Sequence, residues 1–270
     1  MNINNNGDEF YNLVNCPYLF IGLDRDGTLV PYTLTPDLSH VDAEILEILK
    51  ILVSTKNTTV AIISARGLNK LKEDFPIDNI VLGGSCGLEI AHKGNDVFVH
   101  PLAKSFRLVL SQILPQFLQF CQPYNLAIIE DHGLTACLHT KLIKDQLVLK
   151  SIKDKINNLK TQYSNLKVNE LATSYEFYPN LDWSKGMAYR QILNELQLDT
   201  AKILPVFIGD SIADESAYDV VNNLKGLSIK VIHRETASKA KFLVDNESEV
   251  KKFLDKLAKL RHAKHGQWLV

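Results

Sequence analysis

Two carboxylate side chains follow the first apolar segment of the chain. Residues 18–23 form a short apolar run, and Asp24, Asp26 and Gly27 come directly after it. Carboxylates two residues apart at a strand end can point at one locus only if the backbone turns, and glycine permits such a turn. Carboxylates gathered in this way could bind a hard cation and attack or protonate a phosphate ester.

Further polar residues stand at the ends of later apolar runs. Ser64 follows the second run, Asp210 follows the fourth, and Asp214 lies one helical turn beyond Asp210. Lys185 precedes a predicted helix that begins near residue 186. Because ligands bind beyond the carboxyl ends of strands in open parallel sheets, these residues are expected to converge on one site.

This set of residue types matches what phosphate ester hydrolysis requires. The reaction needs an in-line nucleophile, a cation against the shared negative charge, donors for the phosphate oxygens, and an acid for the leaving oxygen. A carboxylate nucleophile forms an aspartyl-phosphate and so divides one difficult step into two. Magnesium suits such a site because it binds a few carboxylates together with phosphate and keeps its waters.

Each of these residues also has a structural interpretation. The first carboxylate pair could be a solvated turn, Ser64 could cap a helix, and Lys185 could be an ordinary surface lysine. Asp210 and Asp214 could start a helix, where the macrodipole favours acidic residues. The joint occurrence of all four elements, each at a strand end or a helix start, favours the catalytic interpretation.

Alternating strand and helix patterns predict the fold of the larger part of the chain. Residues 41–52 have helical apolar spacing, and Ser39 with Asp42 resembles a capping box at its start. Continuous apolar runs separated by helices predict an α/β fold with a parallel sheet that is covered on both faces. The predicted strands are residues 18–23, 58–63, 80–82, 205–208 and 228–232.

The middle of the chain has a different pattern. A helix is predicted at residues 102–120, a hairpin at 126–130 and 134–139, a second helix at 144–163, and two short strands around 173–174. This order predicts a small α+β domain, residues 101–176, inserted into a larger core. The core would then comprise residues 1–100 and 177–270.

Composition and charge exclude several classes of protein. The chain has 270 residues, 46% of them apolar, and a net charge of −1, so nucleic acid and membrane surfaces are not expected partners. Its start lacks a signal-peptide pattern, and no stretch is long and apolar enough to span a bilayer.

The four cysteines form no CxxC pair; they are Cys16, Cys86, Cys121 and Cys137. Free thiols and a cytoplasmic location are therefore expected, while the oligomeric state stays open and a monomer is compatible.

The order of the polar motifs resembles the haloacid dehalogenase superfamily of phosphatases. Residues 24–28 match its DxDGT motif, Ser64 its Ser/Thr motif, Lys185 its Lys motif, and residues 209–215 its GDxxxDE motif. The resemblance implies a Rossmann-like parallel-sheet core. It also implies that the insert is an αββαββ cap.

The same resemblance implies a role for each motif residue. Asp24 would be the nucleophile, and Asp26 the general acid and then the base. Ser64 and Lys185 would bind the phosphoryl group. The magnesium ion would be held by the carboxylates of Asp24 and Asp210 and by the carbonyl of Asp26. Asp214 would support this site.

Within that superfamily the chain most resembles trehalose-6-phosphate phosphatases. Residues 84–89 resemble their GxHGxE stretch, residues 130–133 their ExKG hairpin, and residues 176–179 their ExxP segment. Residues 139–141 stand where an HYR triplet is expected. A sugar phosphate is therefore the expected small-molecule partner, and the candidate substrate-binding residues are Arg66, Glu130, His132, Lys141 and Glu176.

Two of these positions depart from the family pattern, so the identity of the sugar stays open. His132 and Lys141 stand where the family has Lys and Arg, and Lys lacks the planar fork of Arg. Trehalose 6-phosphate is the first expectation. Sucrose phosphate, glucosyl or mannosyl glycerate phosphate, transfer of the phosphomannomutase type, and a non-catalytic binding module stay open. Taken alone, Glu130 could be a solvated edge charge, His132 an exposed turn residue, and Cys86 a small buried residue.

Overall fold

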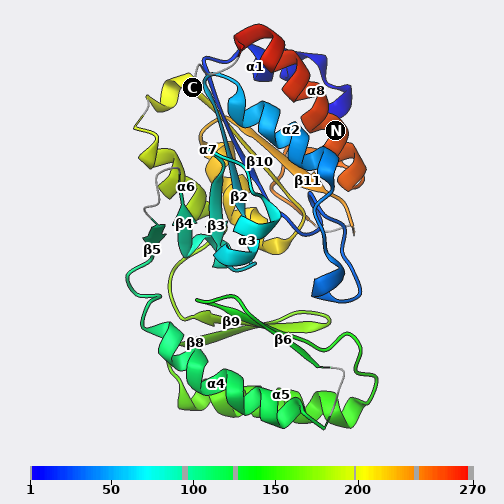
Figure 1. Cartoon of the computed structure of the whole chain (residues 1–270), viewed down its shortest axis with the longest axis vertical. Coiled ribbons are helices and arrows are strands. Elements are labelled where there is room, and N and C mark those ends of the chain that lie inside the picture. The colour runs from blue at the N-terminus through cyan, green and yellow to red at the C-terminus, as the bar shows by residue number, and fades with distance from the viewer. Residues whose placement is uncertain (1, 93–96, 124–126, 198, 234–236, 267–270) are drawn as a thin grey trace.

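The computed structural model describes residues 2–92, 97–123, 127–197, 199–233 and 237–266. A large sheet forms the core in the strand order β12-β11-β10-β1-β2-β3-β4-β5 (Figure 1). The strands from β12 to β3 are parallel, and β4 and β5 continue the sheet in antiparallel pairing. Their bounds are β1 Tyr18–Leu23, β2 Thr58–Ile63, β3 Val81–Gly84, β4 Glu89–Ala91, β5 Val97–Val99, β10 Ile203–Gly209, β11 Leu227–Val231 and β12 Phe242–Val244.

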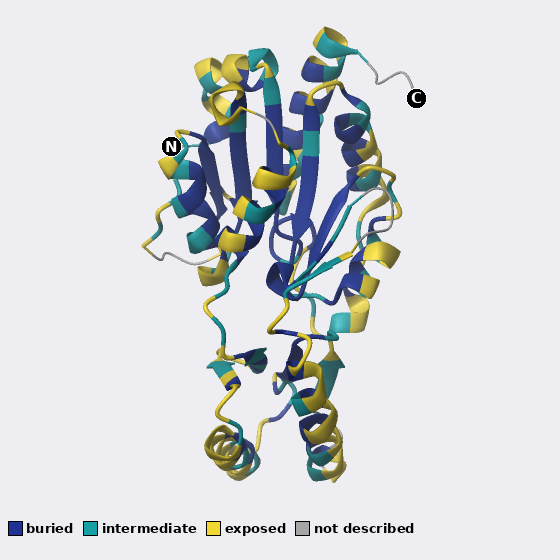
Figure 2. Cartoon of the chain, turned by 90° about the vertical axis from the view of Figure 1, so that its left-hand side faces the viewer, coloured by how far each residue is buried: buried dark blue, intermediate teal, exposed yellow. Residues whose placement is uncertain are grey.

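Helices cover both faces of this sheet. One face packs on α1 (Gly7–Asn15), α2 (Ala43–Ser54) and α8 (Glu247–His265), together with the short α3 (Leu68–Asp74). The other face packs on α6 (Lys185–Glu195) and α7 (Glu215–Asn223). The central strands are therefore buried on both sides, as Figure 2 shows in dark blue. Full burial explains why these strands are continuous apolar runs in the sequence.

The middle of the chain forms a second, antiparallel sheet in the order β6-β7-β9-β8. Its strands are β6 Ile128–Asp131, β7 Ala136–His139, β8 Leu166–Glu170 and β9 Ser174–Pro179, and two helices, α4 Phe106–Cys121 and α5 Gln146–Gln162, cover the face away from the core (Figure 1). Side chains alternate along strands. Leu138 and Phe177 pack under the helices, whereas Glu130, His139 and Glu176 lie on the face toward the core.

These observations confirm the predicted parallel sheet covered on both faces and the inserted α+β cap. The expected end of the insert at residue 176 falls inside β9, which continues to Pro179. The predicted capping box at Ser39 is wrong, because Asp42 caps α2 and accepts the backbone N–H of Glu44. Among the described residues, no helix is both long and apolar enough to cross a lipid bilayer.

Candidate active site

Three aspartates gather at the carboxyl ends of the two central strands. β1 and β10 pair in parallel with Leu23 opposite Ile208, so the residues that follow them are neighbours. Carboxylate oxygens of Asp24, Asp210 and Asp214 lie within 4.8 Å of one another. Asp24 is only 5% exposed, so the interpretation of its motif as a solvated turn is wrong.

Lys185 joins two of these carboxylates. Its Nζ donates to Oδ2 of Asp24 and to Oδ1 of Asp214, at 2.8 Å in both cases. The residue opens α6, which Ser184 caps by accepting the backbone N–H of Met187. At 3% exposure it is no surface lysine. Burial lowers its pKa, but the charges of Asp214 and Asp24 outweigh burial and hold the pKa well above the ordinary value.

Asp214 is a structural residue as well as a partner of the lysine. Its Oδ2 accepts the backbone N–H of Asp210 at 3.2 Å, and both the N–H and the hydroxyl of Ser211, at 2.9 and 2.7 Å. The interpretation as a helix start is therefore confirmed for Asp214, whereas Asp210 precedes the helix, and the side chain of Asp214 also belongs to the cluster. Gly209 makes this possible, because a Cβ there would lie 2.4 Å from Cγ of Asp214.

The cluster carries more negative charge than Lys185 alone can balance. Burial and then the charge of Asp214 raise the pKa of Asp24 well above its ordinary value, and the same two causes raise the pKa of Asp210 to about 6. Oδ2 of Asp210 accepts the hydroxyl of Tyr32 at 2.8 Å, but its Oδ1 is buried and has no hydrogen-bond partner among the described residues. Carboxylate oxygens with an unpaired buried atom fit a hard divalent cation.

The Asp26 carboxylate is not part of this cluster, contrary to the expected convergence, although the predicted turn at Gly27 is present. Gly27 has a φ of 75°, and a Cβ there would lie 2.5 Å from Oδ2 of Asp210. The Asp26 carboxylate instead meets Arg25 Nη1 at 2.6 Å and Arg66 Nε at 2.9 Å. Burial raises the pKa of Asp26, but Arg66 and then Arg25 outweigh burial and lower it. The side chain of Asp26 therefore lies apart from the three clustered carboxylates.

Ser64 is buried at the end of β2, the strand next to β1. Its hydroxyl oxygen accepts the backbone N–H of Arg66 at 3.2 Å. The following helix, α3, has Gly67 as its N-cap, so Ser64 does not cap it. Cys86 is buried nearby, which confirms its interpretation as a small buried residue, and burial raises the pKa of its thiol to about 12.

The predicted sugar ligand Glu130 is held between the core and the cap. Its Oε1 accepts Nη1 of Arg66 at 2.7 Å, and its Oε2 lies 2.6 Å from Nε2 of His139. His132 Nε2 is 3.7 Å from the same oxygen, and the side chain of His132 is only 10% exposed. The interpretations of Glu130 as a solvated charge and of His132 as an exposed turn residue are therefore wrong.

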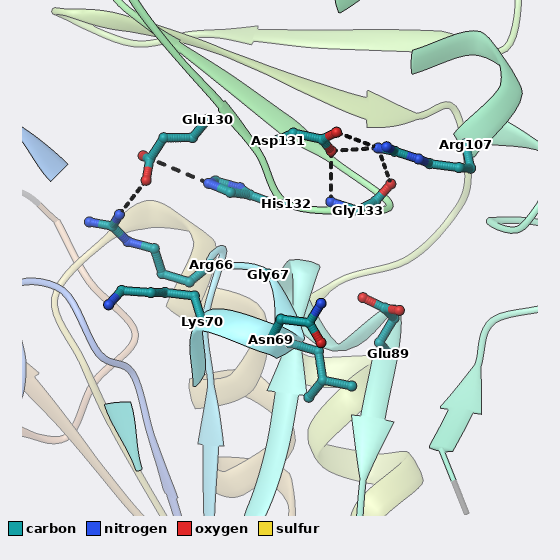
Figure 3. A pocket seen from close by; sticks show the side chains of 11 residues that line it. Arg66, Gly67, Asn69, Lys70, Glu89, Arg107, Glu130, Asp131, His132 and Gly133 are labelled. Atoms are coloured by element: carbon teal, nitrogen blue, oxygen red, sulfur yellow. Dashed lines mark hydrogen bonds and ion pairs between the residues drawn. The ribbon is translucent and has the colours of Figure 1, made fainter. Parts of the chain in front are cut away.

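A cavity of about 500 Å³ opens at this seam between core and cap (Figure 3). Glu130 and His132 line it from the cap, and Arg66 and Glu89 line it from the core. It offers hydrogen-bond donors and acceptors from both sides, which is the chemistry that sugar hydroxyls require. The remaining lining residues are Gly67, Leu68, Asn69, Lys70, Arg107, Asp131 and Gly133.

Lys141 and Glu176 do not line this cavity. Nζ of Lys141 donates to the carbonyl of Thr33 at 3.0 Å, and Oε2 of Glu176 accepts the hydroxyl of Tyr178 at 3.1 Å. Tyr178 belongs to a smaller cavity of about 160 Å³, which Lys185 also lines. The larger cavity thus contains three of the five predicted substrate ligands, Arg66, Glu130 and His132. Glu176 contacts Tyr178 beside the smaller cavity, and Lys141 makes an exposed contact with the core.

Sequence reasoning did not identify several residues of the site. Arg25 occupies the variable position of the DxDGT motif, and Tyr32 lies in an exposed loop. Nothing in the local sequence distinguishes them, because their partners come from distant segments. His139 alone carried a signal, since it stands in the triplet that resembles HYR.

Comparison with known proteins gives a consistent assignment. A family model described as trehalose-phosphatase matches residues 22–248. Trehalose-phosphate phosphatase B of Arabidopsis thaliana is 25% identical over 273 residues, which cover 96% of this chain and 71% of that protein.

Solved structures share the fold. A structure described as a trehalose-6-phosphate phosphatase related protein superposes with a TM-score of 0.78 at 23% identity, over 91% of this chain and 99% of that one. A haloacid dehalogenase-like hydrolase from Bacteroides thetaiotaomicron gives 0.59 at 13% identity, over 89% and 99%. The fold is therefore that of haloacid dehalogenase-like hydrolases, and the match of the family model over most of the sequence shows that this chain belongs to the trehalose-phosphatase family.

Proposed function

We propose that this chain is a magnesium-dependent phosphatase that hydrolyses trehalose 6-phosphate to trehalose and phosphate. The observation that carries the proposal is the buried Asp24 carboxylate, which is bound by Lys185 and lies beside Asp210 and Asp214. This arrangement occurs in a member of the trehalose-phosphatase family. A buried carboxylate next to a fixed ammonium group and a cation site is suited to attack phosphorus.

The unpaired oxygen of Asp210 supports a magnesium site. Asp210 and Asp24 would supply carboxylate oxygens, and the backbone carbonyl of Asp26 would complete the protein ligands. Asp214 would act in support, because its Oδ2 already accepts three hydrogen bonds and its Oδ1 accepts one from Lys185. When bound, Mg²⁺ supplies positive charge against the phosphate oxygens.

In the first step, the Asp24 carboxylate attacks phosphorus and the bond from phosphorus to the sugar oxygen breaks. Asp26 gives that oxygen its proton, while Ser64 and Lys185 hold the phosphoryl oxygens. Water then attacks the phosphorus of the aspartyl-phosphate, Asp26 accepts the proton of the water, and Asp24 is released. The arginines that lower the pKa of Asp26 favour its basic form, and a phosphate dianion beside it favours the protonated form that the first step needs.

The inserted domain would act as a cap over the sugar. We place its limits near residues 101 and 179, since β9 belongs to its sheet up to Pro179. Glu130 and His132 would contact sugar hydroxyls in the larger cavity, with Arg66 beside them, and Glu176 lies on the same core-facing side of the sheet. Closure would exclude bulk water from the phosphoryl group.

A substrate panel tests the proposal. Phosphate release should be measured from trehalose 6-phosphate, sucrose 6-phosphate, mannosyl glycerate phosphate and p-nitrophenyl phosphate, with Mg²⁺ and with EDTA. Trehalose 6-phosphate should have the highest kcat/KM, and EDTA should abolish turnover. If trehalose 6-phosphate reacts no faster than p-nitrophenyl phosphate, the substrate assignment fails, and a faster second sugar phosphate would replace it.

The nucleophile has its own test. Asp24→Asn should abolish both turnover and the acid-stable phosphoenzyme that radiolabelled substrate forms with the wild-type protein. Asp219→Asn is the matched control, since Asp219 pairs with Lys239 on the surface and should leave activity unchanged. Retained turnover in the Asp24 variant would show that another group attacks phosphorus.

We also propose a cytoplasmic monomer. The four cysteines, Cys16, Cys86, Cys121 and Cys137, are free thiols, which accords with a reducing compartment. Every residue assigned to the reaction comes from a single chain, so no second copy is needed to complete the site. Size-exclusion chromatography with light scattering tests the second point, and fractionation of cells tests the first.

A further inference from the structure

Two arginines hold the Asp26 carboxylate, and they belong to different surroundings. Arg25 is fully buried, and besides Asp26 it donates to Oδ2 of Asp74 at 2.9 Å and to the hydroxyl and carbonyl of Ser39 at 2.7 and 2.8 Å. All these partners are core residues. The contact of Arg25 with one oxygen of Asp26, Oδ1 at 2.6 Å, therefore does not depend on the position of the cap.

Arg66 instead joins Asp26 to the cap. Its Nε and Nη2 donate to the two carboxylate oxygens of Asp26 at 2.9 and 3.0 Å, and its Nη1 donates to Glu130 at 2.7 Å. All three side chains are largely buried, with exposures of 13%, 21% and 22%. One planar guanidinium group therefore has a core carboxylate on one edge and a cap carboxylate on another.

The Glu130 end of this bridge is fixed by the cap itself. His139, on the neighbouring strand β7, holds the second oxygen of Glu130 at 2.6 Å. The hairpin that carries Glu130 rests on the core, where the carbonyl of His132 accepts the hydroxyl of Ser85 at 3.1 Å. The hairpin also packs directly against Gly67, because a Cβ at Gly67 would lie 2.7 Å from the carbonyl oxygen of His132. Glu130 can thus reach Arg66 only when the hairpin is seated.

We propose that Arg66 is a positioning residue that makes the placement of the Asp26 carboxylate depend on a closed cap. The inference rests on the proposed function. Seating of the hairpin brings Glu130 to Nη1, and because the guanidinium is rigid and planar, this contact orients the edge that holds Asp26. When the cap opens, Arg66 loses this partner and Asp26 keeps only the hold of Arg25. Proton transfer to the leaving sugar is thereby restricted to the closed protein.

Substrates with different leaving groups separate this role from simple binding. The sugar alkoxide of trehalose 6-phosphate needs a proton to depart, whereas p-nitrophenolate departs without one. Arg66→Lys keeps the charge but cannot hold two carboxylates on two edges. We expect kcat/KM for trehalose 6-phosphate to fall about 100-fold, since a misplaced acid loses most of its contribution, and that for p-nitrophenyl phosphate to fall less than about threefold.

The decisive measurement repeats Arg66→Lys in an Asp26→Asn background. If Arg66 acts through Asp26, the lysine change has no further effect there on trehalose 6-phosphate. If Arg66 contacts the sugar directly, the change costs the same factor in both backgrounds, and the inference is overturned. Equal losses for both substrates in the otherwise native protein would overturn it as well.

Two cap variants complete the design. Glu130→Gln should reproduce the leaving-group selectivity in kcat/KM, because an amide holds Arg66 less strongly than a carboxylate does. Glu170→Gln makes the same change in an exposed pair with Lys153 inside the cap and should alter neither substrate. If Glu130→Gln affects both substrates equally, the contact from the cap does not act on Asp26, and the inference is overturned. If the wild-type protein releases no phosphate from trehalose 6-phosphate, the proposed function and this inference are both overturned. If the wild type is active but the losses caused by Arg66→Lys and Asp26→Asn are additive, only the inference is overturned.

Discussion

Replacement of Asp210 by asparagine should stabilise the metal-free protein while it abolishes activity. The Asp210 side chain is 5% exposed and faces two further carboxylates. Burial and then Asp214 raise its pKa from the ordinary 3.8 to about 6. One pKa unit corresponds to about 1.4 kcal/mol, so ionised Asp210 destabilises the folded state by about 3 kcal/mol. An amide has the same shape without the charge, and its oxygen can still accept the hydroxyl of Tyr32.

The effect should have a defined pH dependence. The pKa of Asp210 is higher in the folded than in the unfolded chain, so the folded state binds more protons between the two values and the wild-type protein loses stability as pH rises through them. The destabilisation is therefore absent below about pH 4 and complete above about pH 6, on the basis of the pKa of about 6. The advantage of Asp210→Asn should grow across this window and stay constant at higher pH.

Thermal unfolding followed by circular dichroism measures the difference. In EDTA at pH 8, the melting temperature of the variant should exceed that of the wild type by roughly 6 °C or more, because 1 kcal/mol shifts a protein of this size by about 2–4 °C. Saturating Mg²⁺ should raise the melting temperature of the wild type and leave that of the variant unchanged. Asp255→Asn is a control on the surface of α8, where Asp255 pairs with Lys259, and should have little effect.

Two results would contradict this reasoning. A metal-free Asp210 variant that melts at or below the wild-type temperature at pH 8 would show that the cluster carries no excess repulsion. A variant that is more stable but is still stabilised by Mg²⁺ to the wild-type extent would show that Asp210 does not bind the ion. The first result would contradict the predicted repulsion between the carboxylates, and the second would contradict the predicted binding of Mg²⁺ by Asp210. The two measurements therefore test the two predictions separately.

Three further substitutions test other contacts of the site. Gly27→Ala places a Cβ 2.5 Å from Oδ2 of Asp210 at a φ of 75°, and it should destabilise the protein by about 2 kcal/mol and weaken Mg²⁺ binding in calorimetry. Lys185→Met leaves Asp24 and Asp214 without their shared ammonium group, and it should lower the free energy of unfolding in urea by about 3 kcal/mol in EDTA and abolish turnover. Gly67→Ala keeps an ordinary backbone but displaces the His132 carbonyl, and it should lower kcat/KM for trehalose 6-phosphate about tenfold while p-nitrophenyl phosphate is unaffected.

The parallel core was predictable because its strands are buried on both faces. The predicted strands at residues 18–23 and 58–63 coincide with β1 and β2. The helix α1 was not predicted from its polar start, because it is stabilised by distant contacts such as that of Phe10 with Phe253 on α8, whose ring centroids lie 5.2 Å apart. The short strands β4, β5 and β12 were also missed, since strands of three residues carry too little pattern.

The site was predictable where the motif and the strand end coincide. Asp24, Asp210 and Asp214 do converge, because parallel strands deliver their carboxyl ends to one edge of the sheet, and Lys185 joins them from the start of α6. Ser39 was misassigned because its partner is Arg25, which its local sequence does not reveal. Sequence spacing describes what one segment can do, whereas these contacts depend on which segments the fold brings together.

The two aspartates of the first motif show why that distinction matters for the chemistry. They are two residues apart, yet burial beside carboxylates raises the pKa of Asp24, and two guanidinium groups lower that of Asp26. Without ligands, these directions are the reverse of those that an ionised nucleophile and a protonated acid need. A cation beside Asp210 would favour the ionised form of Asp24, and a phosphate dianion near Arg66 would favour the protonated form of Asp26. It follows that the proposed reaction needs both ligands together, because each ligand corrects the protonation state of only one of the two aspartates.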